Sequence, residues 1–202
     1  MIGVMPTPGA AMTDSPRPVR RRTGRTPLAT RVLLSCAAIG VAAGVVLAPF
    51  TVWGTLMSTT VPLAYMALTG VWLLGPIVAL DLLRLPGTAL MTCVVVGLIQ
   101  MPFGGAGSIV TMVMIGAAVE LPFLLTRYRV WAWWLFSLTT AVFLALYAWA
   151  VFGYFSMSAT APVVQFAFWA LAILSGQAAA ALGLVVSARL RRAGVGSGSP
   201  TG

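Results

Sequence analysis

Histidine and lysine are absent from this 202-residue chain, so all twelve basic residues are arginines, and only three residues are acidic. These absences remove a histidine general base, histidine metal ligands, a Schiff-base lysine and the lysine of an ATP-binding P-loop. We therefore predict that the chain is not an enzyme, holds no cofactor or metal, and cannot hydrolyse ATP on its own.

Cysteine is also scarce. Cys36 and Cys93 are the only two, and they lie in separate apolar segments without CxxC spacing. This pattern argues against a disulfide framework and against a zinc site.

Charged residues make up only 7% of the chain, whereas 60% of residues are hydrophobic and the mean hydropathy is +1.00. Soluble domains carry about 25% charged residues, and a spanning helix needs about 20 apolar residues. The composition predicts an all-α, multi-pass protein of the cell membrane with six spans in one bundle. We expect the spans at Val32 to Phe50, Pro62 to Leu83, Gly87 to Phe103, Ser108 to Leu125, Val130 to Phe152 and Pro162 to Ala188.

The two ends of the chain are polar. Residues 1 to 30 combine proline, threonine and glycine with five arginines and a single acid, Asp14, and such a segment cannot form a core. We expect a disordered basic cytoplasmic tail over 1 to 30, a transmembrane domain over 31 to 192, and a flexible tail over 193 to 202.

The arginines indicate the orientation, because cytoplasmic loops keep the positive charge. Outside the tail they lie before the first span, between spans two and three, between four and five, and after six: Arg31, Arg84, Arg127, Arg129, Arg189, Arg191 and Arg192. The loops around 51 to 61, 103 to 107 and 153 to 161 carry no charge. This distribution predicts six spans with both termini cytoplasmic.

Small residues repeat along the first span. Ala38 and Ala42 are four apart, as are Gly40 and Gly44. Small residues let membrane helices approach closely. The pattern is equally compatible with packing inside the bundle and with a docking face for another membrane subunit.

Neutral polar and aromatic side chains gather in the outer half of the predicted bundle. Each alone is typical of packing or of the membrane interface, but together they suit a small planar ligand that stacks on rings and hydrogen-bonds to amides. The candidate substrate-binding residues of this group are Tyr65, Trp72, Gln100, Tyr147, Trp149, Gln165 and Trp169.

Glu120 is the only carboxylate well inside an apolar span. An acid at that depth costs about 2.5 to 3.5 kcal/mol on insertion scales, so it marks a candidate functional site with a partner. Two partners remain open, a bound ligand or a buried arginine, Arg127 or Arg84. Asp81 and Arg84, three apart at the inner end of span two, are expected to form a structural ion pair.

The central stretch resembles the substrate-binding S components of energy-coupling factor (ECF) transporters, specifically the YkoE-like family for thiamine or its hydroxymethylpyrimidine moiety. Its motifs are PG-x-AL, which begins at Pro86, and G-x-x-x-E-L-x-F-x-L-T-R-Y-R-x-W, which runs from Gly116 to Trp131.

The resemblance implies a subunit of an ABC-type vitamin importer that works with a transmembrane coupling subunit and two cytoplasmic ATPases. It also implies that Ala38 and Ala42 match the A-x-x-x-A pattern that meets the coupling subunit. Two other classes stay open: a stand-alone secondary transporter or channel, and a structural membrane protein without a ligand.

Overall fold

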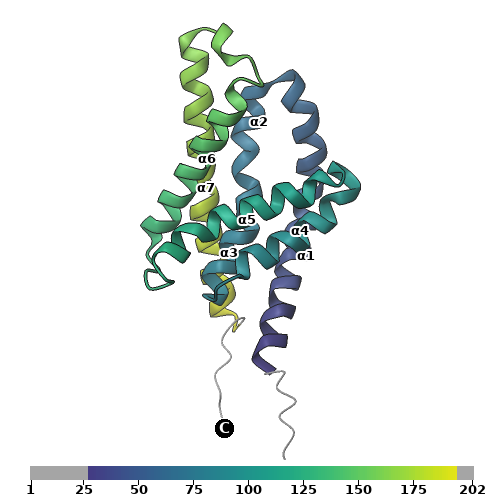
Figure 1. The fold of residues 1–202 in the computed structure, drawn as a ribbon, viewed down its shortest axis with the longest axis vertical. Helices are drawn as coiled ribbons and strands as arrows, with labels where there is room; N and C mark the ends of the chain where they lie inside the picture. Colours follow the sequence, from purple (N-terminus) through teal and green to yellow (C-terminus); the bar gives the residue numbers. More distant parts are fainter. Residues whose placement is uncertain (1–26, 195–202) are drawn as a thin grey trace, which may run out of the picture.

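The computed structural model describes residues 27–194, and the regular structure in this range is entirely helical (Figure 1). The elements are α1 (Pro27–Thr60), α2 (Pro62–Leu68), η1 (Thr69–Leu73), α3 (Leu74–Leu83), α4 (Thr88–Gly104), α5 (Gly107–Leu125), α6 (Trp133–Phe152), η2 (Met157–Ala159) and α7 (Pro162–Arg192). The all-α prediction is confirmed. Most of the two predicted tails lies outside the described residues, although residues 27–30 open α1.

The helix α1 is longer than the predicted first span, because residues 51–60, expected in a loop, are helical. The reason is visible in the hydroxyl side chains of this part. Thr51, Thr55 and Ser58 donate to the carbonyls of Leu47, Thr51 and Thr55 one turn earlier, at 3.2, 2.9 and 2.8 Å. Their polar groups are thus satisfied by the helix itself, and only Val61 separates α1 from α2.

The second predicted span is built from α2, η1 and α3, with the tighter 3₁₀ turn at its middle. Gly70, inside that turn, lies directly against α7. Its N–H donates to Ser175 Oγ at 2.7 Å, and a Cβ on Gly70 would lie 2.1 Å from the Ser175 carbonyl oxygen. Glycine is therefore required here for the two backbones to approach.

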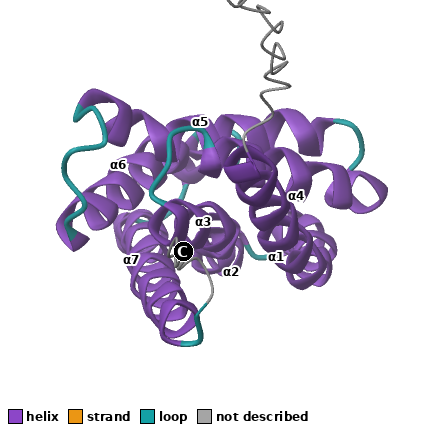
Figure 2. Cartoon of the chain, turned by 90° about the horizontal axis from the view of Figure 1, so that it is seen from below, coloured by secondary structure: helices purple, strands orange, loops and turns teal. Residues whose placement is uncertain are grey.

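The helices α4 and α5 form a close antiparallel hairpin that crosses the long axis of the molecule (Figure 1). Two glycines make the approach possible. A Cβ on Gly97 would lie 2.8 Å from Ile109 Cα, and one on Gly116 would lie 3.0 Å from Leu90 Cα. Viewed from below, α3 lies between α7 and α4, and α5 and α6 form a second layer (Figure 2).

The fifth span begins at Trp133 and not at the predicted Val130, because the connection from α5 to α6 extends to Ala132. Arg127 and Tyr128 have left-handed backbone at φ 51° and 55°, and Ala132 is extended. Trp131 folds back so that its ring centroid is 5.5 Å from that of Phe123. Burial raises the pKa of Tyr128 in this connection above its ordinary value.

The predicted ion pair at the end of α3 is confirmed and is part of a larger network. Asp81, only 3% exposed, lies 3.7 Å from Arg84 and 2.9 Å from Arg191 of α7, and Ser187 donates to the same carboxylate. The Arg84 guanidinium also lies 5.6 Å from the ring centroid of Trp131. These contacts join α3, α7 and the α5–α6 connection at one end.

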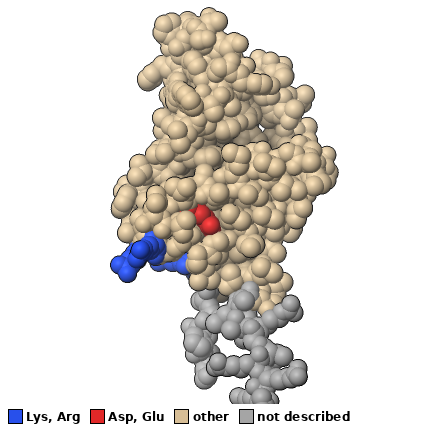
Figure 3. All heavy atoms as spheres, in the orientation of Figure 1, with Lys and Arg blue, Asp and Glu red and all other residues tan. Residues whose placement is uncertain are grey.

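Arginine side chains gather at one end of the face drawn in Figure 3. Five helical stretches of the described chain are long and apolar enough to cross a membrane: Thr30–Thr60, Pro62–Leu83, Gly107–Leu125, Trp133–Phe152 and Pro162–Arg192. The helix α4, with 17 residues, is apolar but shorter, and it fills the third predicted span.

Reporter fusions test the orientation, which stays a prediction. Because cytoplasmic ends keep the arginines, fusions at Gly107 and Ser158 should give an external signal. A fusion at Leu85 should give an internal one as the matched control. An internal signal at Gly107 or Ser158 would contradict the six-span model with both termini cytoplasmic.

Candidate ligand-binding site

A partly enclosed cavity of about 650 Å³ lies in the half of the bundle away from the arginines. Its walls come from the second half of α1, from α2 and η1, from the tip of the α4–α5 hairpin, and from the end of α6 with the residues that follow it. Ligand cavities of small-molecule sites have volumes of about 300 to 1,000 Å³. The volume is therefore suited to a molecule the size of a vitamin.

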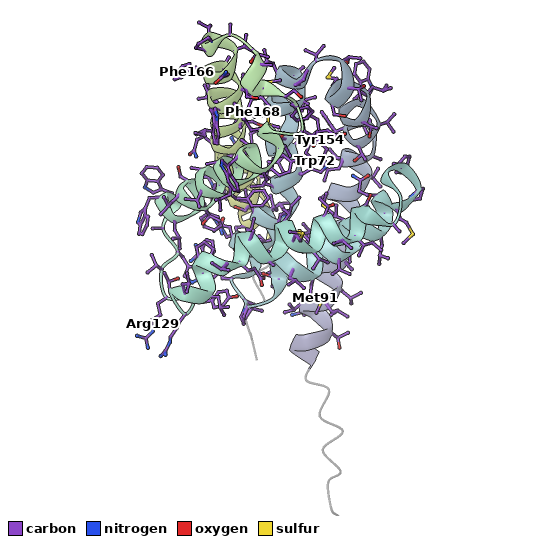
Figure 4. All side chains as sticks on the ribbon, turned by 45° about the horizontal axis from the view of Figure 1, so that its top comes forward. Trp72, Met91, Arg129, Tyr154, Phe166 and Phe168 are labelled. Carbon is purple, nitrogen blue, oxygen red and sulfur yellow. The ribbon has the colours of Figure 1, made fainter. Side chains whose placement is uncertain are left out.

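Aromatic rings form one wall of the cavity. The hydroxyls of Tyr65 and Tyr147 are 2.6 Å apart, so α2 and α6 are joined across the bundle. The ring centroids of Trp72 and Tyr65 are 5.9 Å apart at an interplanar angle of 52°, and those of Phe155 and Tyr65 are 5.7 Å apart. Tyr154 also lines the cavity, and it is labelled with Trp72 in Figure 4. These rings offer surfaces on which a planar ligand can stack.

Gln100 contributes the amide of the site. It lies in the last turns of α4, lines the cavity and is 1% exposed. Neither its Oε1 nor its Nε2 has a hydrogen-bond partner among the described residues. An unpaired buried polar group costs about 1 to 3 kcal/mol. The structure therefore leaves a donor and an acceptor ready for a bound molecule.

Hydroxyl groups on α1 form another part of the lining. Thr51, Thr55 and Ser58 line the cavity while their protons are donated to backbone carbonyls, which leaves oxygen lone pairs to accept from a ligand. These three residues are not among the predicted site residues, because a loop was expected around 51 to 61. Their spacing of four and three residues is typical of one helix face, and this is the sequence signal that could have identified them.

The structure brings four of the predicted site residues together at the cavity: Tyr65, Trp72, Gln100 and Tyr147. Three others lie elsewhere. Trp149 is 72% exposed, Gln165 Nε2 donates to the Thr160 carbonyl at 3.0 Å, and Trp169 packs on Phe152 with ring centroids 6.2 Å apart. Helical spacing along one span did not distinguish the cavity face from the neighbouring faces.

Glu120 does not line the cavity. Its carboxylate, on α5, accepts from the backbone N–H of Ala89 at 2.9 Å and of Leu90 at 3.4 Å, in the first turn of α4. The first N–H groups of a helix have no partner within the helix, and the helix dipole favours a negative charge there. Among the described residues no arginine pairs with Glu120, whose hydrogen bonds come from α4, and its contact with a ligand stays a prediction. Its partner is the end of a neighbouring helix.

The two small-residue patterns of α1 lie on different faces. A Cβ on Gly40 would lie 2.7 Å from Val95 Cβ, and one on Gly44 would lie 2.9 Å from Ile99 Cβ, so these glycines pack against α4. Ala38 and Ala42 are exposed. Packing inside the chain's own bundle is thus done by the glycines, and the alanine face is left open.

The cavity carries no formal charge, because the side chains that line it are hydroxyl, amide, thioether or apolar. No group of three or more histidine, cysteine or acidic residues that could hold a metal ion occurs in the part of the chain that the structure describes. Its chemistry is therefore stacking and neutral hydrogen bonding.

Comparison with known proteins supplies two findings. Residues 31–147 match the model of a family described as "ABC-type cobalt transport system, permease component". Among solved structures, a "Crystal structure of an S-component of ECF transporter" is similar with a TM-score of 0.73 and 24% identity, covering 84% of this chain and 89% of that one. A search of curated proteins found no match.

The contact of Glu120 with α4 predicts what its replacement does. Glu120→Ala leaves buried N–H groups unpaired, so the free energy of unfolding should fall by about 1 to 3 kcal/mol, measured as a lower melting temperature in detergent. Glu120→Gln keeps an acceptor oxygen and should recover most of the loss.

A molecule bound in the cavity should keep its affinity in both variants, because Glu120 does not line the cavity. Wild-type melting together with a tenfold loss of affinity would instead put this carboxylate at the ligand.

Proposed function

Because the chain belongs to the family of ABC-type cobalt transport system permease components, we propose that it is the substrate-binding S component of an ECF importer for thiamine or its hydroxymethylpyrimidine precursor. It is a multi-pass protein of the cell membrane. The family and the fold are those of a transport component and not of an enzyme.

The side chains that line the cavity support an organic ligand. Tyr65, Trp72 and Tyr147 supply rings, the unpaired amide of Gln100 supplies a donor and an acceptor, and the α1 hydroxyls accept from amino or hydroxymethyl groups. An aminopyrimidine has a flat face and an edge with one donor beside one acceptor. The positive ring of thiamine can also lie over the face of a tryptophan, which contributes about 0.5 to 2 kcal/mol.

Cobalt, named in the family description, is the second candidate ligand. Divalent cobalt is held in proteins mainly by imidazole, thiolate and carboxylate groups. The lining has none of these, since its only soft donors are the thioethers of Met112 and Met114. The donor set therefore supports an organic molecule over a bare metal ion.

The partners follow from the same proposal: a transmembrane coupling subunit and two cytoplasmic ATPases. The chain has no lysine for an ATP-binding loop, which supports the supply of energy by other subunits. Ala38 and Ala42 support a docking face on α1, because they are exposed while Gly40 and Gly44 take the contact with α4.

A stand-alone secondary transporter is the competing class. Such proteins need ionisable groups near the site to couple ion and substrate. Asp81 is held by two arginines and a serine, and Glu120 is held by α4, both away from the cavity. Thiamine uptake by the lone chain in liposomes would favour this class over the S component.

Tryptophan fluorescence tests the ligand. Thiamine or hydroxymethylpyrimidine at high micromolar concentration should quench the emission of the purified protein in a saturable way. Trp72→Phe should remove most of the quenching, because Trp72 lines the cavity. Trp149→Phe is the matched control and should keep it, since Trp149 is 72% exposed and lies elsewhere.

A titration with Co²⁺ under the same conditions should leave the emission unchanged. Saturable quenching by Co²⁺ that depends on Trp72, without quenching by the organic compounds, would reverse the choice of ligand.

The docking face is tested by the double variant Ala38→Leu and Ala42→Leu. Larger side chains block close helix approach, so the variant should lose assembly with the coupling subunit and lose uptake, with an unchanged dissociation constant for thiamine. Val41→Leu, on the same exposed side of α1, is the control and should assemble. Normal assembly and uptake by the double variant would contradict the assignment.

A further inference from the structure

Gln100 differs from the other two glutamines of the chain. Gln165 Nε2 donates to the Thr160 carbonyl at 3.0 Å, and Gln177 exchanges two hydrogen bonds with Ser137 of α6. Both amide atoms of Gln100 are buried without a partner among the described residues. Nothing in the described part of the chain therefore determines which end of this amide is oxygen and which is nitrogen.

An amide can exchange its two ends by a half turn about its last side-chain bond. In most proteins the neighbouring hydrogen bonds select one of the two orientations. Without such neighbours, the two orientations of Gln100 can present a ligand with donor and acceptor in either order. The Tyr65–Tyr147 pair has the same freedom, because either hydroxyl can be the donor.

We propose that the Gln100 amide forms two hydrogen bonds with a heterocycle edge that bears one donor and one acceptor side by side, in either order. The site would then take amino-pyrimidines and oxo-pyrimidines with similar affinity. In the amino form the exocyclic NH₂ donates and the ring nitrogen accepts, whereas in the oxo form the ring N–H donates and the carbonyl accepts. This inference rests on the proposed function, since it concerns the same cavity and a pyrimidine ligand.

Three probes of one shape test the inference on the wild-type protein. They are 4-amino-5-hydroxymethyl-2-methylpyrimidine, its 4-oxo-3H analogue, and 5-hydroxymethyl-2,4-dimethylpyrimidine, in which a methyl replaces the amino group. Dissociation constants are measured by calorimetry in detergent. The amino and oxo compounds should bind within about threefold of each other. The dimethyl compound should bind ten- to a hundredfold more weakly, because it leaves a buried end of the amide unpaired.

The variant Gln100→Met keeps the size of the side chain and removes the amide. It should bind the three compounds within about threefold of one another. Gln177→Met is the matched control, because Gln177 does not line the cavity. It should keep the wild-type preference even if its melting temperature falls.

The outcomes separate the inference from the proposed function. Tenfold or greater preference for the amino compound over the oxo compound in the wild type would mean a fixed amide and would overturn the inference, while the proposed function would stand. Equal binding of all three compounds would overturn it too, because the edge would not be read. Absence of binding by all three at millimolar concentration would refute the pyrimidine function itself.

Discussion

The contact between the Glu120 carboxylate and the first turn of α4 is the constraint on which the rest of the structure depends. Hydrocarbon offers no water to the free N–H groups of a helix end, so a neighbouring side chain must pair with them. Glu120 accepts from Ala89 and Leu90 and so fixes one end of the α4–α5 hairpin. The other end of the hairpin lines the cavity, and Gln100 lies eleven residues, about 16 Å, along α4 from Ala89.

Close backbone contacts extend this constraint through the bundle. Gly97 and Gly116 bring α4 against α5, Gly40 and Gly44 bring α1 against α4, and Gly70 brings η1 against α7. In a membrane, helix association depends on such packing because lipid removes the hydrophobic driving force between helices. The amide of Gln100 can stay without a hydrogen-bond partner because the glycine contacts and the Asp81 network stabilise the surrounding helices.

The sequence predicted the fold well where a proline, glycine or arginine lies at or just beyond the end of a long apolar run. The predicted and observed bounds agree at Pro62, Leu83 and Leu125. It failed over residues 51–60, since hydroxyl side chains that resemble a loop in composition can pair with their own helix. For the site, the aromatic and amide stripe identified Tyr65, Trp72, Gln100 and Tyr147 as neighbours of one cavity. It could not place Glu120, because the group that pairs with it belongs to the backbone, and backbone N–H groups have no sequence signature.

Because α1 is one continuous helix of 34 residues, it carries two separate surfaces along its length. Ala38 and Ala42 are exposed in its first half, and Thr51, Thr55 and Ser58 line the cavity in its second half. About 14 Å of helix separates Ala42 from Thr51, with Pro49 between them. Pro49 has no N–H to bond the carbonyl one turn earlier, so the hydrogen-bond ladder of α1 is interrupted between the exposed alanines and the cavity hydroxyls. A bend of this helix would therefore fall between the two surfaces and leave each of them intact.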